Sequence, residues 1–211
     1  MKIFNWNCNG ALRKKLDIVK RVNADLWIGG NKNKGILVAS RSRHELISLE
    51  WNNPDGLQLF LPFVYRGIVF VAVWTKQANS PNFRYIGQLW KYIRLHKVVF
   101  SRFKPIIIGD FNSNVIWDEW DRWWNHSDLE RILEEMGIKS LYHSKFNEMS
   151  GSETQPTFFL HRKHDRPYHI DYCFMPTRNH SNSNIKIGDR KEWLEYSDHL
   201  PLIIDSEGLE K

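Results

Sequence analysis

Residues 105–112 read Pro-Ile-Ile-Ile-Gly-Asp-Phe-Asn, so an entirely apolar run passes directly into a polar end. Such a run is typical of a buried central strand, and we expect a strand over residues 105–109. Because side chains alternate along an extended chain, Asp110 and Asn112 leave the strand on the same side. The stretch therefore predicts a carboxylate and an amide together at one edge of a sheet, or a plain Gly-Asp turn that closes a buried strand.

Outward from this stretch, the sequence alternates between the two-residue period of strands and the longer period of helices. Strand patterns cover residues 2–8, 35–40, 56–65, 68–74, 157–160, 169–175 and 200–204. Helical patterns cover residues 12–22, 86–93 and 127–136, where Ser127 and Glu130 predict a capping box. Hairpin-like strand pairs between the helices predict two packed sheets with helices outside, although periodicity alone also fits other mixed α/β folds.

Length and composition are those of one globular domain over residues 1–211, without repeats or linkers. The longest apolar run, Ile68 to Trp74, is far shorter than the roughly 18 residues of a membrane-spanning helix. The start of the chain also lacks the apolar core of a secretory signal. With only Cys8 and Cys173, a disulfide framework is excluded, and we expect a reducing, cytoplasmic setting.

Charge and aromatic content point to a polyanionic partner. The chain has 30 Lys and Arg against 24 Asp and Glu, a net charge of +6, and it contains 10 Trp. Aromatic faces beside basic groups suit stacking on nucleobases. We therefore expect Trp123 and Arg122, which follow the Asp110–Asn112 edge, to contact nucleic acid. Trp117, Trp120 and Trp124 also fit one face of a helix, which is the alternative of a core role.

Three further polar clusters lie near strand ends. The first strand ends in Asn-Trp-Asn-Cys-Asn at residues 5–9, and Ser-Asp-His at 197–199 precedes the last strand. Asp171 is an acid on an otherwise apolar strand, which is unfavourable unless the acid is paired, and orienting an imidazole is a common reason to keep one. Taken singly, these clusters could also be an Asn-rich turn and a capping turn.

The four clusters together, in this order, resemble the endonuclease/exonuclease/phosphatase family. The motifs are Trp6-Asn7, Gly109-Asp110-Phe111-Asn112, Ile170-Asp171-Tyr172 and Ser197-Asp198-His199-Leu200-Pro201, and they span nearly the whole chain. The resemblance implies a DNase-I-like fold, a four-layer α/β/β/α sandwich of two mixed β-sheets flanked by helices.

The resemblance also implies a metal site. Asn7 and Asp198 would help to hold a divalent ion, and Asp110 would position or deprotonate the attacking water. A site rich in carboxylate and amide oxygens suits Mg²⁺ or Mn²⁺ better than zinc. We therefore expect three other histidines to be loop residues rather than zinc ligands: His161, His164 and His180.

By the same resemblance, Asn112 and His199 would contact the scissile phosphate, with Asp171 orienting the imidazole ring. Hydrolysis of a phosphodiester needs in-line attack by water, and hydrogen-bonding or cationic groups must neutralise the charge that builds on the phosphoryl oxygens. The implied catalytic set is Asp110, Asn112, Asp171 and His199.

The chain departs from the family pattern where a strand ending in Gln-Glu should supply the main metal carboxylate. An ungapped alignment sets Asn31 at the Glu position. A gapped alignment treats residues 26–35 as the start of the next strand pair, so that the Glu-bearing strand is missing, and we favour it because residues 34–39 resemble the third strand. In a second departure, Trp74-Thr75-Lys76 stands where a His or Tyr is usual, and no catalytic role is expected there.

The resemblance thus implies a metal-dependent phosphodiester hydrolase, a nuclease of low activity because the Glu is absent. Three alternatives stay open. The chain could be a catalytically impaired member that binds nucleic acid or another protein, or a phosphomonoesterase acting on inositol phosphates or lipids. It could also lack a segment that the working protein has.

Overall fold

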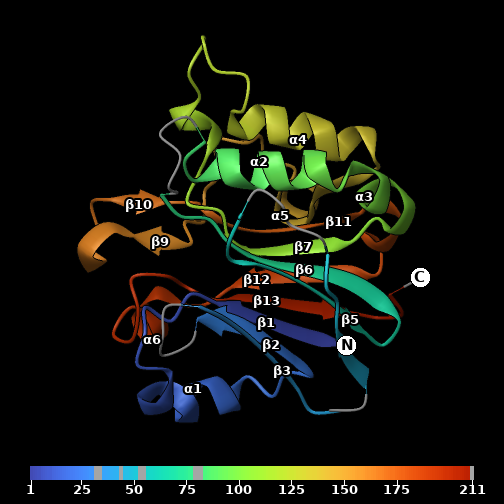
Figure 1. Cartoon of the computed structure of the whole chain (residues 1–211). Helices are drawn as coiled ribbons and strands as arrows, with labels where there is room; N and C mark the ends of the chain where they lie inside the picture. The colour runs from blue at the N-terminus through green and yellow to red at the C-terminus, as the bar shows by residue number, and fades with distance from the viewer. Residues whose placement is uncertain (31–34, 43–44, 52–55, 78–82, 210–211) are drawn as a thin grey trace.

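The computed structural model of the chain describes residues 1–30, 35–42, 45–51, 56–77 and 83–209. Across these residues two β-sheets lie face to face, and helices cover both outer faces (Figure 1). Each sheet contains both parallel and antiparallel pairs. The predicted four-layer α/β/β/α sandwich is therefore confirmed.

The first sheet has the strand order β12-β13-β1-β2-β3. Its strands are β1 (Lys2–Trp6), β2 (Leu26–Gly30), β3 (Ile36–Ser40), β12 (Ser183–Ile187) and β13 (Leu202–Ser206). β1 pairs in parallel with β2 and antiparallel with β13, so the two ends of the chain meet in the centre of this sheet.

The second sheet has the order β4-β5-β6-β7-β11-β8. Its strands are β4 (Leu46–Ser48), β5 (Phe60–Tyr65), β6 (Ile68–Trp74), β7 (Ile106–Asp110), β8 (Ile138–Ser140) and β11 (Asp171–Pro176). The apolar run at residues 106–108 is fully buried at the centre, as its composition predicts. A separate ribbon of β9 (Phe158–Phe159) and β10 (Pro167–Tyr168) lies beside the sandwich.

Helices α2 (Ile86–Leu95), α3 (Lys97–Phe103) and α4 (His126–Glu135) cover the second sheet, and α1 (Leu16–Arg21) and α6 (Arg190–Trp193) cover the first (Figure 1). α5 (Leu141–Phe146) packs against β11 and β12 at the edge of both sheets. One apolar cluster fills the space between the sheets, and a second and third lie under the helices on each side. No helix in the described part of the chain is long and apolar enough to cross a membrane.

β2 corrects the expectation that the Glu-bearing strand is missing. Residues 26–30 form this strand beside β1, with Ile3 opposite Leu26 and Trp6 opposite Gly29, and β3 follows on its other side. A strand therefore stands at residues 26–30, where the gapped alignment had none, and the first Glu of the sequence is Glu45. Asn31, which takes the Glu position in the ungapped alignment, lies outside the described residues.

Two local expectations differ from the structure. The capping box of α4 consists of Asn125 and Asp128 rather than Ser127 and Glu130, because the helix begins at His126 and each side chain bonds the other residue's backbone N–H. Residues 118–125 form turns instead of a helix, so Trp117, Trp120 and Trp124 do not share a helical face. Trp120 is 98% exposed, which excludes a core role for it.

Candidate active site

Two buried aspartates face each other where β7 ends and β11 begins. Asp110 is the last residue of β7 and Asp171 the first of β11, and the two are paired directly across the antiparallel ladder. Like charges in directly opposite positions repel. A neighbouring cation therefore stabilises this arrangement.

His199 supplies that cation from the loop before β13. Its Nδ1 donates to Asp171 Oδ2 at 2.9 Å, and its Nε2 lies 3.8 Å from Asp110 Oδ2. Burial opposes the charged ring, but the charges of Asp171 and Asp110 outweigh it and raise the pKa of His199 to about 9. The hydrogen bond expected between Asp171 and His199 is thus present, and the imidazole is cationic at neutral pH.

Backbone geometry at the end of β7 brings the side chain of Asn112 back to the carboxylate of Asp110. Gly109 has φ +151°, and a Cβ there would lie 1.8 Å from the carbonyl oxygen of Val73, so only glycine fits. Asn112 turns back with φ +45°, a conformation that Asn tolerates well. Its Nδ2 donates to Asp110 Oδ2 at 2.8 Å and its backbone N–H to Asp110 Oδ1 at 2.9 Å. The carboxylate and amide predicted at this edge therefore do lie together.

The carboxyl group of Asp110 is buried, with Asp171, His199 and Asn7 around it. Burial raises its pKa, and the negative charge of Asp171 adds to this effect, while the positive charge of His199 and the amide of Asn7 lower it. Such a carboxyl group holds a proton more readily than an exposed one, which is the property expected of a proton acceptor near neutral pH.

The first sheet contributes Asn7, directly after β1. Asn7 Nδ2 donates to Asp110 Oδ2 at 2.9 Å and lies 3.4 Å from His199 Nε2. Asn9 then links Asn7 to Asp198, because its backbone N–H donates to Asn7 Oδ1 at 3.2 Å and its side chain donates to Asp198 Oδ1 at 3.1 Å. All six predicted metal and catalytic residues therefore gather at one edge shared by the two sheets.

Three residues to which the sequence analysis assigns no role support the site. Trp6 Nε1 donates to the carbonyl oxygen of His199 at 2.8 Å. Ser197 Oγ accepts from the His199 N–H at 3.1 Å and donates to the carbonyl oxygen of Asn7 at 2.8 Å. Thr157 Oγ1 accepts from two backbone N–H groups at the start of β11, including that of Asp171 at 3.0 Å. Trp6 and Ser197 stand inside the quoted motifs, whereas Thr157 could not be distinguished from an ordinary strand residue.

A small pocket opens between the sheets beside Asn7 and Asp110. Gly30, the last residue of β2, forms part of its wall. A Cβ on Gly30 would lie 3.7 Å from Cys8 Sγ and 4.0 Å from Asn7 Oδ1, both ordinary contacts, and its backbone is outside the left-handed region. A side chain at position 30 would therefore fit and would start next to the amide oxygen of Asn7.

No family model matches the sequence, and no curated protein matches it. Solved structures match along nearly its whole length. An AP endonuclease from Archaeoglobus fulgidus superposes with a TM-score of 0.72 at 18% identity, over 99% of this chain and 100% of that one. The 3' phosphatase NExo from Neisseria, bound to a product DNA hairpin, gives 0.70 at 15% identity with the same coverage. The chain has the DNase-I-like fold. The endonuclease domain of TRAS1, a telomere-specific non-LTR retrotransposon, matches at 0.60 and 15% identity, over 100% of this chain and 99% of that one.

In this fold, side chains that could bind a metal ion lie close together. Asp110, Asp171 and His199 hold ligand atoms within 4.8 Å of one another. Asn7 donates to Asp110, and Asp198 is linked to Asn7 through Asn9. Amide and carboxylate oxygens are donors of the kind that hard divalent cations prefer. However, hydrogen bonds already occupy both oxygens of Asp110. The donor set fits such an ion in kind.

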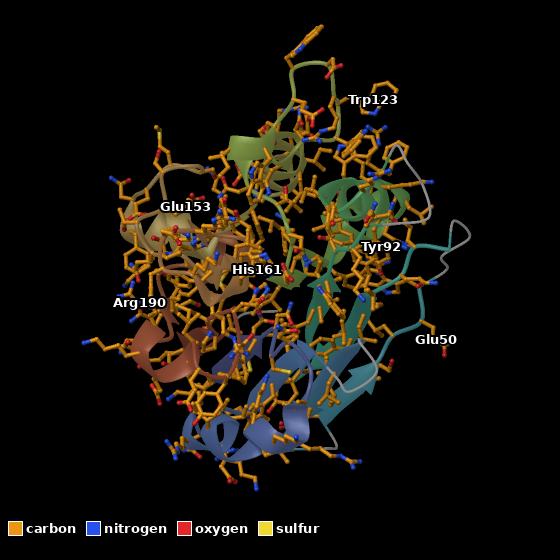
Figure 2. The ribbon with its side chains drawn as sticks, turned by 90° about the vertical axis from the view of Figure 1, so that its left-hand side faces the viewer. Glu50, Tyr92, Trp123, Glu153, His161 and Arg190 are labelled. Carbon is orange, nitrogen blue, oxygen red and sulfur yellow. The ribbon has the colours of Figure 1, made fainter. Side chains whose placement is uncertain are left out.

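The two residues expected to contact nucleic acid differ in their surroundings. Trp123 is 71% exposed on a groove between α2 and α4, at the upper right of Figure 2. Arg122 donates to Asn125 Oδ1 at 2.7 Å and to the carbonyl oxygen of Trp117 at 2.8 Å, and its guanidinium lies 4.5 Å from the ring of Trp124. Arg122 therefore supports its own loop, and its contact with nucleic acid stays a prediction.

Proposed function

We propose that this chain is a phosphoesterase that cleaves nucleic acid. The observation that carries the proposal is the buried Asp171–His199–Asp110 arrangement, with Asn7 and Asn112 beside it, at an edge that two sheets share. A cationic imidazole and two amides can stabilise the charge that develops on a phosphoryl group. The solved structures of similar fold are nucleases and a 3' phosphatase, which supports the same class of chemistry.

Each side chain has a role in this proposal. Asp110 accepts the proton of the attacking water, and His199 and Asn112 bind the phosphoryl oxygens. Asp171 fixes the tautomer and orientation of the His199 ring through its 2.9 Å hydrogen bond. Because the ring is already charged and held before substrate arrives, little reorganisation is needed during the reaction.

The proposal includes a divalent ion, Mg²⁺ or Mn²⁺, with Asn7 and Asp198 as ligands and Asp110 at its side. When bound, such an ion withdraws charge from the phosphoryl group and helps water to ionise. Carboxylates provide most of the affinity for a hard dication, and the family's Glu is absent here. We therefore propose weak binding of the ion and low activity.

The proposal is tested with labelled single-stranded, hairpin and abasic-site DNA and with RNA, in Mg²⁺, Mn²⁺ or EDTA. We expect slow cleavage that requires the metal ion and half-saturates at millimolar rather than micromolar ion concentrations. His199→Ala is the inactive control. Full activity in excess EDTA would overturn the metal-dependent assignment, and release of phosphate from inositol phosphates without any cleavage of nucleic acid would favour the phosphomonoesterase alternative.

A second candidate function is binding of nucleic acid without cleavage, and the absence of the metal-binding Glu favours it. The net charge of +6 suits a polyanion. Trp123 offers an exposed ring in the groove where Trp90, Arg94 and Lys97 also lie. Bases stack on such rings with little regard to sequence, and we propose that Trp123 contacts single strands there.

Trp123→Ala is expected to weaken binding of single-stranded DNA by about tenfold, since stacking contributes about 1–3 kcal/mol per base. The measurement is fluorescence anisotropy in EDTA at several salt concentrations, where the slope gives the number of phosphates contacted. Trp120→Ala is the matched control, because Trp120 is 98% exposed and does not line the groove. Equal losses of affinity in the two variants, or no loss in Trp123→Ala, would show that the groove is not part of the binding surface.

We propose further that residues 1–211 work as one domain in the cytoplasm. Cys8 and Cys173 are both buried free thiols, which agrees with a reducing compartment. Burial raises the pKa of Cys173 to about 12, so this thiol is unreactive at neutral pH.

A further inference from the structure

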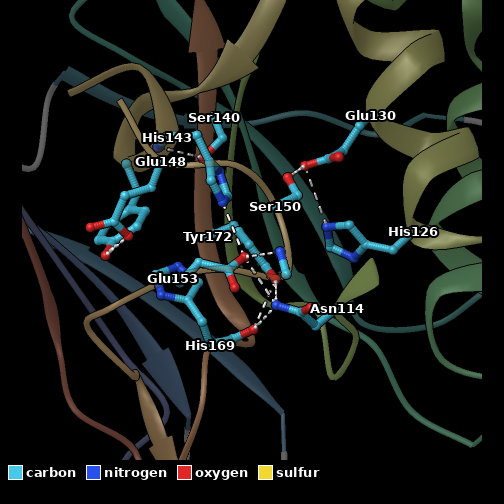
Figure 3. A network of polar contacts seen from close by, with 12 residues as sticks. Asn114, His126, Glu130, Ser140, His143, Glu148, Ser150, Glu153, His169 and Tyr172 are labelled. Carbon is cyan, nitrogen blue, oxygen red and sulfur yellow. Dashed lines mark hydrogen bonds and ion pairs between the residues drawn. The ribbon is translucent and has the colours of Figure 1, made fainter. Parts of the chain in front are cut away.

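Behind the candidate active site, a second polar network is buried between α4, α5, β11 and the loop at residues 148–155 (Figure 3). Its central acid is Glu153, whose side chain is only 5% exposed. Oε1 of Glu153 accepts from His143 Nε2, from Asn114 Nδ2 and from the Gly151 N–H, each at 3.0 Å. A buried carboxylate with three donors on one oxygen is held in a fixed place.

Burial opposes the charge of Glu153, but the hydrogen bonds from His143, Gly151 and Asn114 outweigh it and lower the pKa of Glu153 to about 2. The carboxylate is therefore ionised at neutral pH. His143 is itself oriented from the other side, where its Nδ1 lies 2.7 Å from Ser140 Oγ at the end of β8.

Asn114 extends the network to two segments of the candidate active site, the loop after β7 and the start of β11. Besides Glu153, its Nδ2 reaches the carbonyl oxygen of His169 at 3.0 Å and the hydroxyl of Tyr172 at 3.1 Å. The Tyr172 hydroxyl in turn reaches the carbonyl oxygens of Ser113 at 3.1 Å and His169 at 2.8 Å. These contacts fasten the loop after β7 to the start of β11.

The fastened segments are those that present the candidate catalytic groups. Asn114 stands two residues after Asn112, and His169 stands two residues before Asp171. The Phe111 N–H donates to the carbonyl oxygen of Ile170 at 2.9 Å, so the same two segments meet again next to the site. A shift of the Asn114 side chain would therefore move the phosphate-binding amide relative to the acid that orients His199.

We infer that Glu153 is a positioning residue, whose carboxylate sets the distance between the Asn112 loop and the Asp171 strand end. It touches neither the reacting atoms nor the candidate metal ligands. A misplacement of about 1 Å by a distant substitution can lower a rate by about a hundredfold. The effect on turnover rests on the proposed function, whereas the link between the two segments does not.

Glu148 gives a matched control on the same loop. Its carboxylate also has three donors, the Tyr142 hydroxyl at 2.8 Å and the N–H and hydroxyl of Thr154 at 2.9 and 2.6 Å. None of these donors belongs to the Asn112 loop or to β11. Glu148→Gln therefore weakens the same loop without touching the link through Asn114.

The expected result for Glu153→Gln is a fall in kcat of about 10- to 100-fold with KM changed less than threefold. Glu148→Gln should keep kcat within about twofold. Glu153→Asp, which retains the charge, should recover part of the loss. Asn114→Ala combined with Glu153→Gln should be far from additive, because both remove the same link.

Hydrogen exchange supplies a readout that does not depend on catalysis. Glu153→Gln should speed exchange of the amides at residues 111–116 and 170–171, and Glu148→Gln should not. If Glu153→Gln does not fold, Glu153→Asp replaces it, since its shorter side chain keeps the charge but weakens the contact with Asn114, and the same two segments should exchange faster to a smaller extent. Unchanged exchange at both segments, or the same change in both Gln variants, would overturn the inference. An inactive wild-type chain that still shows the selective exchange would count against the proposed function alone.

Discussion

Asp171→Asn is expected to lower kcat by about a thousandfold, because an acid that orients a catalytic imidazole contributes a factor of this size. The substitution keeps the shape of the side chain and removes its charge. The His199 ring then loses both its 2.9 Å charged partner and its fixed tautomer. Single-turnover cleavage at saturating metal ion is the measurement.

The raised pKa of His199 predicts in which direction Asp171→Asn shifts the pH dependence of the rate. The charges of Asp171 and Asp110 overcome burial and raise the pKa of His199 to about 9, so the cation persists at neutral pH. Without the charge of Asp171 the pKa of the ring falls, and the alkaline limb of the rate profile moves to lower pH. The raised pKa stabilises the fold fully below the unfolded value of about 6.5, and that stability is lost as the pH rises through about 9.

Asp165→Asn is the control for this experiment, since Asp165 is exposed in the loop between β9 and β10. It should leave both the rate and its pH profile unchanged. Thermal unfolding at pH 7 should show that Asp171→Asn is folded. Unchanged turnover of folded Asp171→Asn at neutral pH would show that the His199 ring needs no acid to orient it.

The centre of the site could be predicted from the sequence because its groups stand within a few residues of strand ends. A strand's period fixes which side chains leave together, so the pairing of Asp110 with Asn112 followed from residues 105–112 alone. The meeting of Asp171 with His199 is different, because 28 residues separate them. It is implied by the family resemblance, and Thr157 supplies a physical reason, because its Oγ1 accepts from the Asp171 N–H at 3.0 Å and its carbonyl oxygen accepts from the Leu200 N–H at 2.7 Å.

What could not be predicted depends on tertiary contacts. Asn114 and Glu153 are 39 residues apart, and nothing in the spacing of either shows that they meet in the core. The turns at residues 118–125 replace a helix because Asn125 caps α4 and accepts from Arg122, two local bonds that outweigh the apolar periodicity of the tryptophans. The strand β2 could not be predicted because two consecutive glycines weaken its strand pattern, and it forms through its pairing with β1 and β3.

Restoring a carboxylate at the end of β2 should raise affinity for the metal ion. Gly30→Asp is expected to tighten Mg²⁺ or Mn²⁺ binding by about tenfold or more, since a carboxylate attracts a hard dication far better than an amide does. The new Cβ would stand 4.0 Å from Asn7 Oδ1, with no backbone conflict. Isothermal titration calorimetry measures the affinity directly, and the cleavage rate at low metal ion should rise with it.

Gly30→Asn is the matched control, because it fills the same space without a charge. An equal gain in both variants would mean that packing rather than charge improved the site. No gain in either would mean that the ion does not lie next to Asn7, and the assignment of Asn7 as a ligand would then fail.

Asn31→Glu provides the independent version of the same experiment. The pairing of β2 with β1 supports the ungapped alignment, in which position 31 is where the family carries its Glu. If both Gly30→Asp and Asn31→Glu increase affinity and activity, the weak site results from one missing charge in an otherwise intact DNase-I-like fold. If the wild-type chain already cleaves rapidly with micromolar Mg²⁺, then Asn7, Asp110 and Asp198 suffice to hold the ion. The expectation of low activity would then be wrong, because the acid at the end of β2 would be dispensable in this chain.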